Sequence, residues 1–126
     1  MKQIFTLFSA FVVLTSFTLS ASIDEMVKAL KEGNAAEIAR YFDNTVEITL
    51  PDKSNSYSKS QGEVVLRDFF INNRVDGSSF LYIGANTGPL FCLGLLVTKN
   101  GTYRATVFMK LKGGRQILQE IRFEHL

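Results

Sequence analysis

The sequence predicts an α+β protein in which three N-terminal helices pack in a strongly bent antiparallel sheet. Three observations lead to this class. Apolar residues recur with helical spacing early in the chain, and four long strand-like segments follow without a helix between them. Pairs of turn-forming residues separate those segments. With 126 residues, 46% of them hydrophobic, the chain fits one domain and is too apolar to be disordered.

The first 22 residues have the composition of a secretory signal peptide. Lys2 is their only charge, an apolar stretch runs from Ile4 to Leu19, and small residues follow up to Ser22. We therefore expect cleavage near Ser22, export to the periplasm or beyond, and one domain over residues 23–126 without a membrane span. The alternative is an uncleaved N-terminal anchor. Loss of Lys2 lowers the formal net charge from +2 to +1, which argues against a nucleic-acid partner.

Three segments show the helical i, i+3, i+4 spacing of apolar residues. Each begins with Ser or Asn three residues before a Glu, the spacing of a capping box. Glu63 and Arg67 form an i, i+4 surface pair within the third segment. The predicted helices cover Ser22–Lys31, Asn34–Phe42 and Ser60–Asn73.

The remaining segments read as strands. Val46–Leu50 alternates apolar and polar residues, as a half-exposed strand does. The polar stretch 51–60 is either a loop or the second arm of a hairpin in which Tyr57 pairs back onto that strand. Four further strands are predicted at Ser78–Ala85, Leu90–Thr98, Thr102–Lys112 and Arg115–His125.

The turns between the last three strands predict a register. Three-residue turns ending at Gly101 and Gly114, with a positive φ at Gly101, place Tyr103 opposite Phe123. The inner face then holds alternate residues from these strands: Phe91, Leu93, Leu95, Val97, Tyr103, Ala105, Val107 and Met109. The outer face holds Leu90, Cys92, Leu96 and Phe108. That face is too apolar to meet water, so we expect a homodimer formed sheet to sheet through these four residues.

The order helix, helix, strand or hairpin, helix and strand meander, together with the segment SYSKSQGEVVLRDFF from Ser56 to Phe70, carries a resemblance. The chain resembles the nuclear-transport-factor-2-like superfamily over Ile23 to His125. It also resembles a family of small exported bacterial proteins of unknown function. The resemblance implies the cone-shaped α+β fold, also called cystatin-like, and implies no activity.

Enzymes of that superfamily place inside the cone an Asp base with a Tyr and a second acid as oxyanion donors, or a set of Asp with His or Arg. Here the predicted inner face offers Tyr41, Tyr82, Tyr103 and Gln119 as pocket residues, without a carboxylate among them. The single His125 lies at the chain end and the single Cys92 lies in an apolar strand, so we expect no catalytic set, no metal site and no cofactor.

The function we favour is a non-enzymatic exported protein that binds a small apolar ligand in the cone or a protein partner through its sheet. The alternatives are a cone-pocket isomerase, dehydratase or hydrolase, and a structural module of an envelope assembly. The chemistry of the sequence does not name a ligand.

Overall fold

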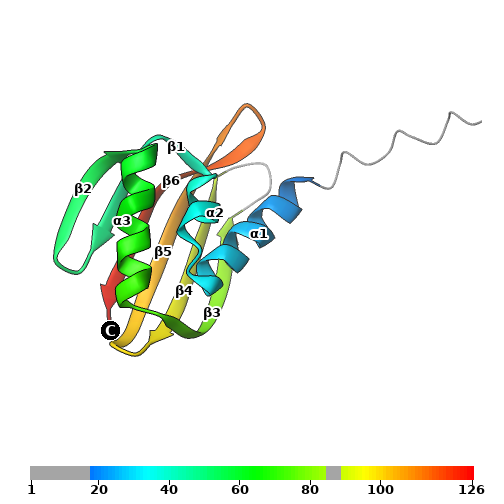
Figure 1. Cartoon of the computed structure of the whole chain (residues 1–126). Helices are drawn as coiled ribbons and strands as arrows, with labels where there is room; N and C mark the ends of the chain where they lie inside the picture. The colour runs from blue at the N-terminus through cyan, green and yellow to red at the C-terminus, as the bar shows by residue number, and fades with distance from the viewer. Residues whose placement is uncertain (1–17, 85–88) are drawn as a thin grey trace, which may run out of the picture.

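The structure is a computed structural model that describes residues 18–84 and 89–126. Three helices lie against one face of a curled six-stranded sheet (Figure 1), which confirms the predicted α+β class. The helices are α1 (Thr18–Glu32), α2 (Ala35–Ala39) and α3 (Lys59–Asn72). The strands are β1 (Phe42–Leu50), β2 (Lys53–Ser58), β3 (Val75–Gly84), β4 (Leu90–Thr98), β5 (Gly101–Lys112) and β6 (Arg115–His125).

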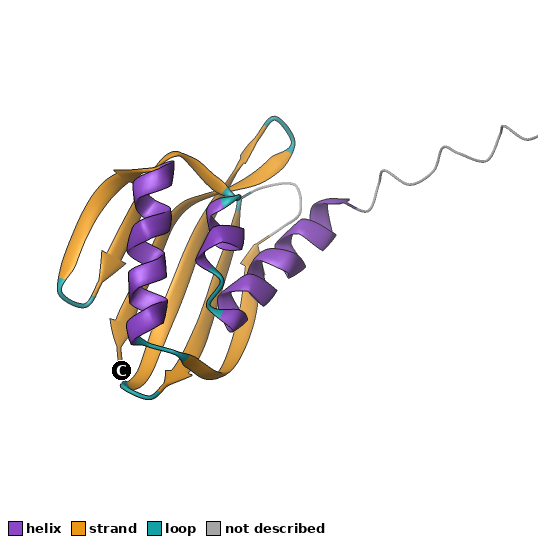
Figure 2. Ribbon diagram, in the orientation of Figure 1, coloured by secondary structure: helices purple, strands orange, loops and turns teal. Residues whose placement is uncertain are grey.

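The strand order across the sheet is β2-β1-β6-β5-β4-β3. Four of the five pairings are antiparallel, and β1 runs parallel to β6, so the sheet is mixed. Residues 51–60, for which a loop and a hairpin were both open, supply the second arm of a β1–β2 hairpin, with Tyr57 opposite Val46. Figure 2 shows the helices on one side of this sheet only.

The helices differ from the prediction at their ends. Helical backbone begins at Thr18, upstream of the predicted cap at Ser22. The second helix ends at Ala39 and β1 begins at Phe42, because the amides of Arg40 and Tyr41 donate hydrogen bonds to carbonyls three residues back and so end the helix.

The third helix is capped by Ser58, not Ser60, since the Ser58 hydroxyl accepts a hydrogen bond from the amide of Gln61 at 3.3 Å. No helix in the described part of the chain is long and apolar enough to cross a membrane.

The predicted β4–β5 register is wrong. Thr98 pairs with Gly101, so the turn has two residues, and Leu96 lies opposite Tyr103. Gly101 has the predicted positive φ, at 119°. A shift of one residue turns every side chain of a strand to the other face. Even-numbered residues of β4 therefore face the helices, and Cys92 and Leu96, predicted on the outer face, are fully buried.

A second irregularity lies in β6. Gly113 and Gly114 both have positive φ and form a two-residue turn that pairs Lys112 with Arg115. The β5–β6 register then shifts by a β-bulge, because Met109 pairs with Leu118 but Phe108 pairs with Glu120. Gln119 is the extra residue, and its side chain is exposed rather than on the inner face where it was predicted.

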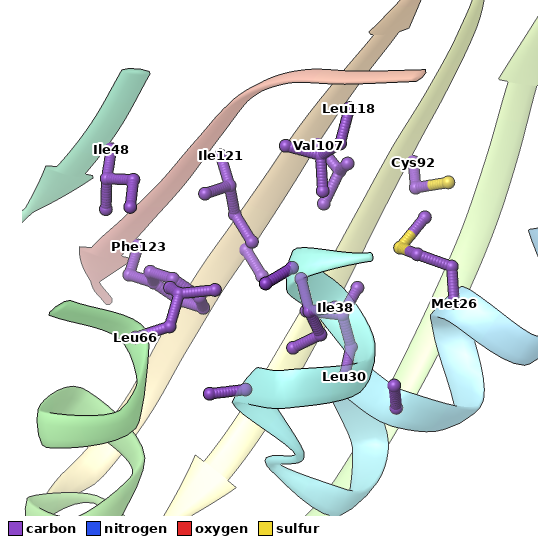
Figure 3. Close-up of a cluster of buried hydrophobic side chains, with 14 of the residues drawn as sticks. Met26, Leu30, Ile38, Ile48, Leu66, Cys92, Val107, Leu118, Ile121 and Phe123 are labelled. Atoms are coloured by element: carbon purple, nitrogen blue, oxygen red, sulfur yellow. The ribbon is translucent and has the colours of Figure 1, made fainter. Parts of the chain in front are cut away.

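The core lies between the helices and the concave side of the sheet. Figure 3 shows Met26 of α1 reaching toward Cys92 of β4, and Leu66 of α3 beside Phe123 of β6. Burial raises the pKa of the Cys92 thiol to about 11, as expected for a cysteine that packs as an apolar side chain. The Phe69 and Phe123 rings stack with their centroids 4.4 Å apart. Aromatic and aliphatic side chains therefore fill the inside of the cone.

Candidate functional site

A cleft of about 450 Å³ opens at the end of the sheet where the chain terminates. Its walls come from three places: the β1–β2 turn, the C-terminal half of α3, and the ends of β5 and β6. Cavities of several hundred cubic ångströms are the size that binds small organic molecules. Because of its size, this cleft is the first candidate for a functional site.

One stripe of α3 forms the helical wall of the cleft. Val65, Asp68, Phe69 and Asn72 all line it, and they are spaced i, i+3, i+4 and i+7. The helical spacing predicted this helix, but neither Asp68 nor Asn72 was among the predicted pocket residues. The polar residues Asp68 and Asn72 share a helix face with the apolar Val65 and Phe69, and this pattern could have indicated that α3 lines a cleft.

The Asn73 side chain is the centre of a hydrogen-bonded network at the floor of the cleft. The Tyr103 hydroxyl donates to Asn73 Oδ1 at 3.0 Å, and Asn100 Nδ2 donates to the same oxygen at 2.8 Å. Asn73 Nδ2 in turn donates to the backbone oxygen of Phe69 at 3.0 Å. Because Asn73 and Tyr103 are both mostly buried, these bonds satisfy polar groups that have little access to water. The network fixes α3, the β4–β5 turn and Tyr103 relative to one another.

His125 stacks on Tyr103 at the cleft. The two residues pair across β5 and β6, and their ring centroids are 4.2 Å apart. The sequence analysis placed Phe123 opposite Tyr103. The two-residue turn and the bulge at Gln119 shift the strands by two positions, and this shift brings His125 into contact with Tyr103.

The cleft carries more negative than positive charge. Asp52 and Asp68 line it together with Lys53. Neither carboxylate forms an ion pair with any residue in the described ranges, whereas Asp43, Glu63 and other acidic residues pair with Lys or Arg. Two carboxylates in one cleft without a bound partner favour a cationic occupant.

Of the four predicted pocket residues, the three whose side chains the structure describes do not come together. Tyr103 lies at the cleft and is buried. Gln119 is exposed at the bulge, and the Tyr82 side chain lies outside what the structure describes. Tyr41 is half-buried and does not line the cleft, and burial first and the charge of Glu25 second raise the pKa of its phenol.

The outer face of the sheet holds a second candidate site. Leu81, Leu95 and Val97 are 59%, 39% and 46% exposed, which is high for such side chains within strands. Phe91 and Phe108 are partly exposed beside them, with ring centroids 5.1 Å apart. We call the residues of this surface the outer patch: Leu81, Phe91, Leu93, Leu95, Val97 and Phe108.

The outer patch shares one residue, Phe108, with the predicted interface. Cys92 and Leu96 are in the core, and Leu90 packs against the core from the inner side. The patch consists mainly of odd-numbered residues of β4 because of the corrected register. The outer face therefore does carry an excess of apolar residues, as predicted, but most of those residues are not the predicted ones.

Charged residues of both signs border the outer patch. On β5 and β6, Arg104 pairs with Glu124 at 3.4 Å and Arg122 pairs with Glu120 at 2.7 Å. The Arg122 guanidinium also lies 5.2 Å from the centre of the Phe108 ring, at cation–π distance. The outer face of the sheet thus has an apolar half, which is the outer patch, and beside it a charged half on β5 and β6 in which the two signs alternate.

Comparison with known proteins gives the family and the fold. A protein from Bacteroides uniformis, described as a DUF4783 family protein, is 26% identical, with a TM-score of 0.77 over 82% of this chain and 95% of that chain. Another described in the same way, from Bacteroides ovatus, is 24% identical, with a TM-score of 0.76 over 81% of this chain and 93% of that chain.

An NTF2-like protein from Cytophaga hutchinsonii is 8% identical, with a TM-score of 0.59 over 85% of this chain and 94% of that chain, a likeness of fold alone. No curated protein matches the sequence. The family described as Domain of unknown function (DUF4783) matches residues 23–124. Both resemblances drawn from the sequence are thus confirmed, and this chain belongs to the DUF4783 family.

Proposed function

We propose that this protein is an exported, non-catalytic binding protein that pairs with a second copy of itself through the outer patch. The observation that carries the proposal is the exposure of the patch on a face that no described helix covers (Figure 2). Contiguous exposed apolar surface is typical of a protein–protein contact. The leader-like composition of residues 1–22 supports export.

The charges beside the patch favour a second copy as the partner. Dimers with two-fold symmetry bury the same surface on both subunits, so that surface must be complementary to itself. The charged half carries Arg104 and Arg122 alternating with Glu120 and Glu124. A two-fold rotation can bring the arginines of one copy onto the glutamates of the other while the two apolar halves meet. A partner of single-sign charge would match this surface less well.

The packing inside the cone supports a role on the outside. Phe69, Phe70, Met109 and Phe123 are buried together there, at positions where a cone-bound ligand would need room. The Tyr103 hydroxyl, an oxyanion donor in the enzymatic alternative, is hydrogen bonded to Asn73. These contacts weigh against the isomerase-type alternative and against an apolar ligand deep in the cone.

The test is the substitution Val97→Glu. Val97 is 46% exposed and lies in the outer patch, so the fold should tolerate the charge, whereas two facing copies would bury it without a partner. We expect the wild-type protein to be a dimer by size-exclusion chromatography with light scattering. The variant should be a monomer with an unchanged circular dichroism spectrum.

The matched control is Val64→Glu on α3, which introduces the same charge at a valine with 49% exposure on the helical side. This control should remain a dimer. The proposal fails if the wild type is a monomer at high micromolar concentration, or if Val97→Glu and Val64→Glu have the same mass in solution.

A further inference from the structure

We propose that the cleft beside Tyr103 binds a small organic cation, a primary ammonium group attached to a short apolar body. This site is separate from the outer patch and goes beyond the proposed dimer. The proposal follows from three properties of the cleft: its apolar wall, its unpaired carboxylates and the hydroxyl at its floor.

The apolar wall of the cleft indicates that the ligand has an apolar body. Leu50 at the end of β1 and Val65 and Phe69 of α3 line the cleft. An aliphatic chain of several carbons would bury surface against them, at about 25 cal/mol per Å². The cleft volume of about 450 Å³ admits such a molecule and not a macromolecular segment with its own fold.

The carboxylates that line the cleft indicate that the ligand carries a positive charge. Asp68 of α3 and Asp52 of the β1–β2 turn both line the cleft. Within the described ranges neither has an ion-pair partner, and the cleft lining carries one cation, Lys53. An ammonium group between them would form charge-assisted hydrogen bonds, which are stronger than neutral ones. An anionic ligand would meet two unneutralised carboxylates.

The floor supplies an oriented acceptor. A tyrosine hydroxyl that donates its one proton still has oxygen lone pairs that accept. Here the Tyr103 proton goes to Asn73 Oδ1 at 3.0 Å, and the ring is held by stacking on His125. The hydroxyl oxygen is therefore left as a hydrogen-bond acceptor, which suits the N–H groups of an ammonium better than a carboxylate.

The experiment compares three probes with the same six-carbon body: hexylammonium, hexanol and hexanoate. Each is titrated into the purified protein while backbone amide shifts are followed by NMR. We expect hexylammonium to shift the amides of Asp68, Asn72 and Tyr103 with saturation, and to bind at least about tenfold more tightly than hexanol or hexanoate, since one charge-assisted bond is worth that ratio. Hexanol or hexanoate binding equally well at these amides would overturn the proposal.

Two variants locate the site. Asp68→Asn keeps the size of an exposed side chain and removes its charge, and should weaken hexylammonium binding about tenfold. Asp76→Asn makes the same change at an exposed position that does not line the cleft, and should leave binding unchanged. Equal affinity of the two variants would show that the ammonium does not bind at Asp68. Because Val97→Glu alters only the outer patch, it should bind hexylammonium as the wild type does, so either proposal can fail without the other.

Discussion

Gly94 is the residue that lets the Phe80 side chain lie flat against β4. The two residues pair directly across β3 and β4, and Phe80 packs against the core from there. A Cβ at position 94 would come within 2.3 Å of the Phe80 ring, far inside van der Waals contact. A glycine within a strand often marks such a close approach. The absence of a side chain here is therefore a packing requirement.

We predict that Gly94→Ala lowers the free energy of unfolding by about 1–3 kcal/mol, the usual cost of overpacking, because the Phe80 ring must leave its place. Urea denaturation followed by circular dichroism measures this change. The control is Gly77→Ala in β3, where a Cβ meets nothing closer than Val97 at 3.9 Å. A Gly94→Ala variant as stable as the control would show that Phe80 does not depend on the glycine.

Asn73 shows how one residue can position several elements. It follows the last residue of α3, and its side chain accepts bonds from the Tyr103 hydroxyl and from Asn100 Nδ2 while donating to Phe69. Sequence analysis treated it as a helix end. Nothing local indicates that its partners lie 27 and 30 residues further along the chain.

At the scale of elements, an ion-paired cluster joins the start of β1 to the end of β5. Asp43 Oδ2 lies 2.7 Å from Lys110 Nζ, and Asp43 Oδ1 lies 3.1 Å from Lys112 Nζ. The hydrogen bond from Lys110, followed by those from the Asn44 amide and Lys112, holds the pKa of the Asp43 carboxyl well below its usual range. The cluster thus connects two strands that are separated in the sheet by β6.

The direction of the pKa shift gives a pH dependence. A carboxyl whose pKa is lowered on folding stabilises the protein above its unfolded pKa of about 3.9. That contribution disappears as the pH falls toward the folded-state pKa. We predict that Asp43→Asn lowers Tm at pH 7, and that the gap from the wild type narrows once the pH falls below about 4.

Thermal denaturation between pH 2 and pH 7 measures both curves. Asp76→Asn is the control, because Asp76 makes no ion pair within residues 18–84 and 89–126. High salt should also narrow the gap at pH 7, since exposed ion pairs are screened. A Tm gap of the same size at pH 2 and pH 7 would contradict the role given to Asp43.

At the scale of the whole molecule, the described core of α1 and the family match begin at the same residue. The described core residues of α1 are Ile23, Met26, Val27, Ala29 and Leu30. The family match also begins at residue 23. Cleavage near Ser22 would therefore shorten α1 at its start and leave the described hydrophobic core intact.

We predict that the protein recovered after export from a bacterial host begins at Ile23. Intact-mass spectrometry measures the start directly, and thermal denaturation of that product should show one cooperative transition. A mass that retains residues 1–22, found in the membrane fraction, would instead support the uncleaved anchor.

The sequence by itself determined the three helices, β1, the last four strands and their order, and left β2 open between a loop and a hairpin arm. Gly and Asn residues in the turns located both ends of β4 and the start of β6, because those residues adopt turn conformations that are costly for others. Helical spacing located the cores of α1 and α3 for a similarly local reason. The segment from Ser56 to Phe70, with the element order, was specific enough to indicate the family.

Only the tertiary structure decided which faces of the strands meet the helices. β4 is apolar at odd and even positions alike, so its pattern did not distinguish a register from one shifted by a single residue. The choice is made by packing: Gly94 admits Phe80 and Cys92 meets Met26, which turns Leu95 and Val97 outward. The bulge at Gln119 is likewise settled by long-range pairing, and it places His125 on Tyr103. Non-local contacts, and not local conformational preference, determine these two registers. Both candidate sites depend on the registers, so the sequence alone did not locate the sites.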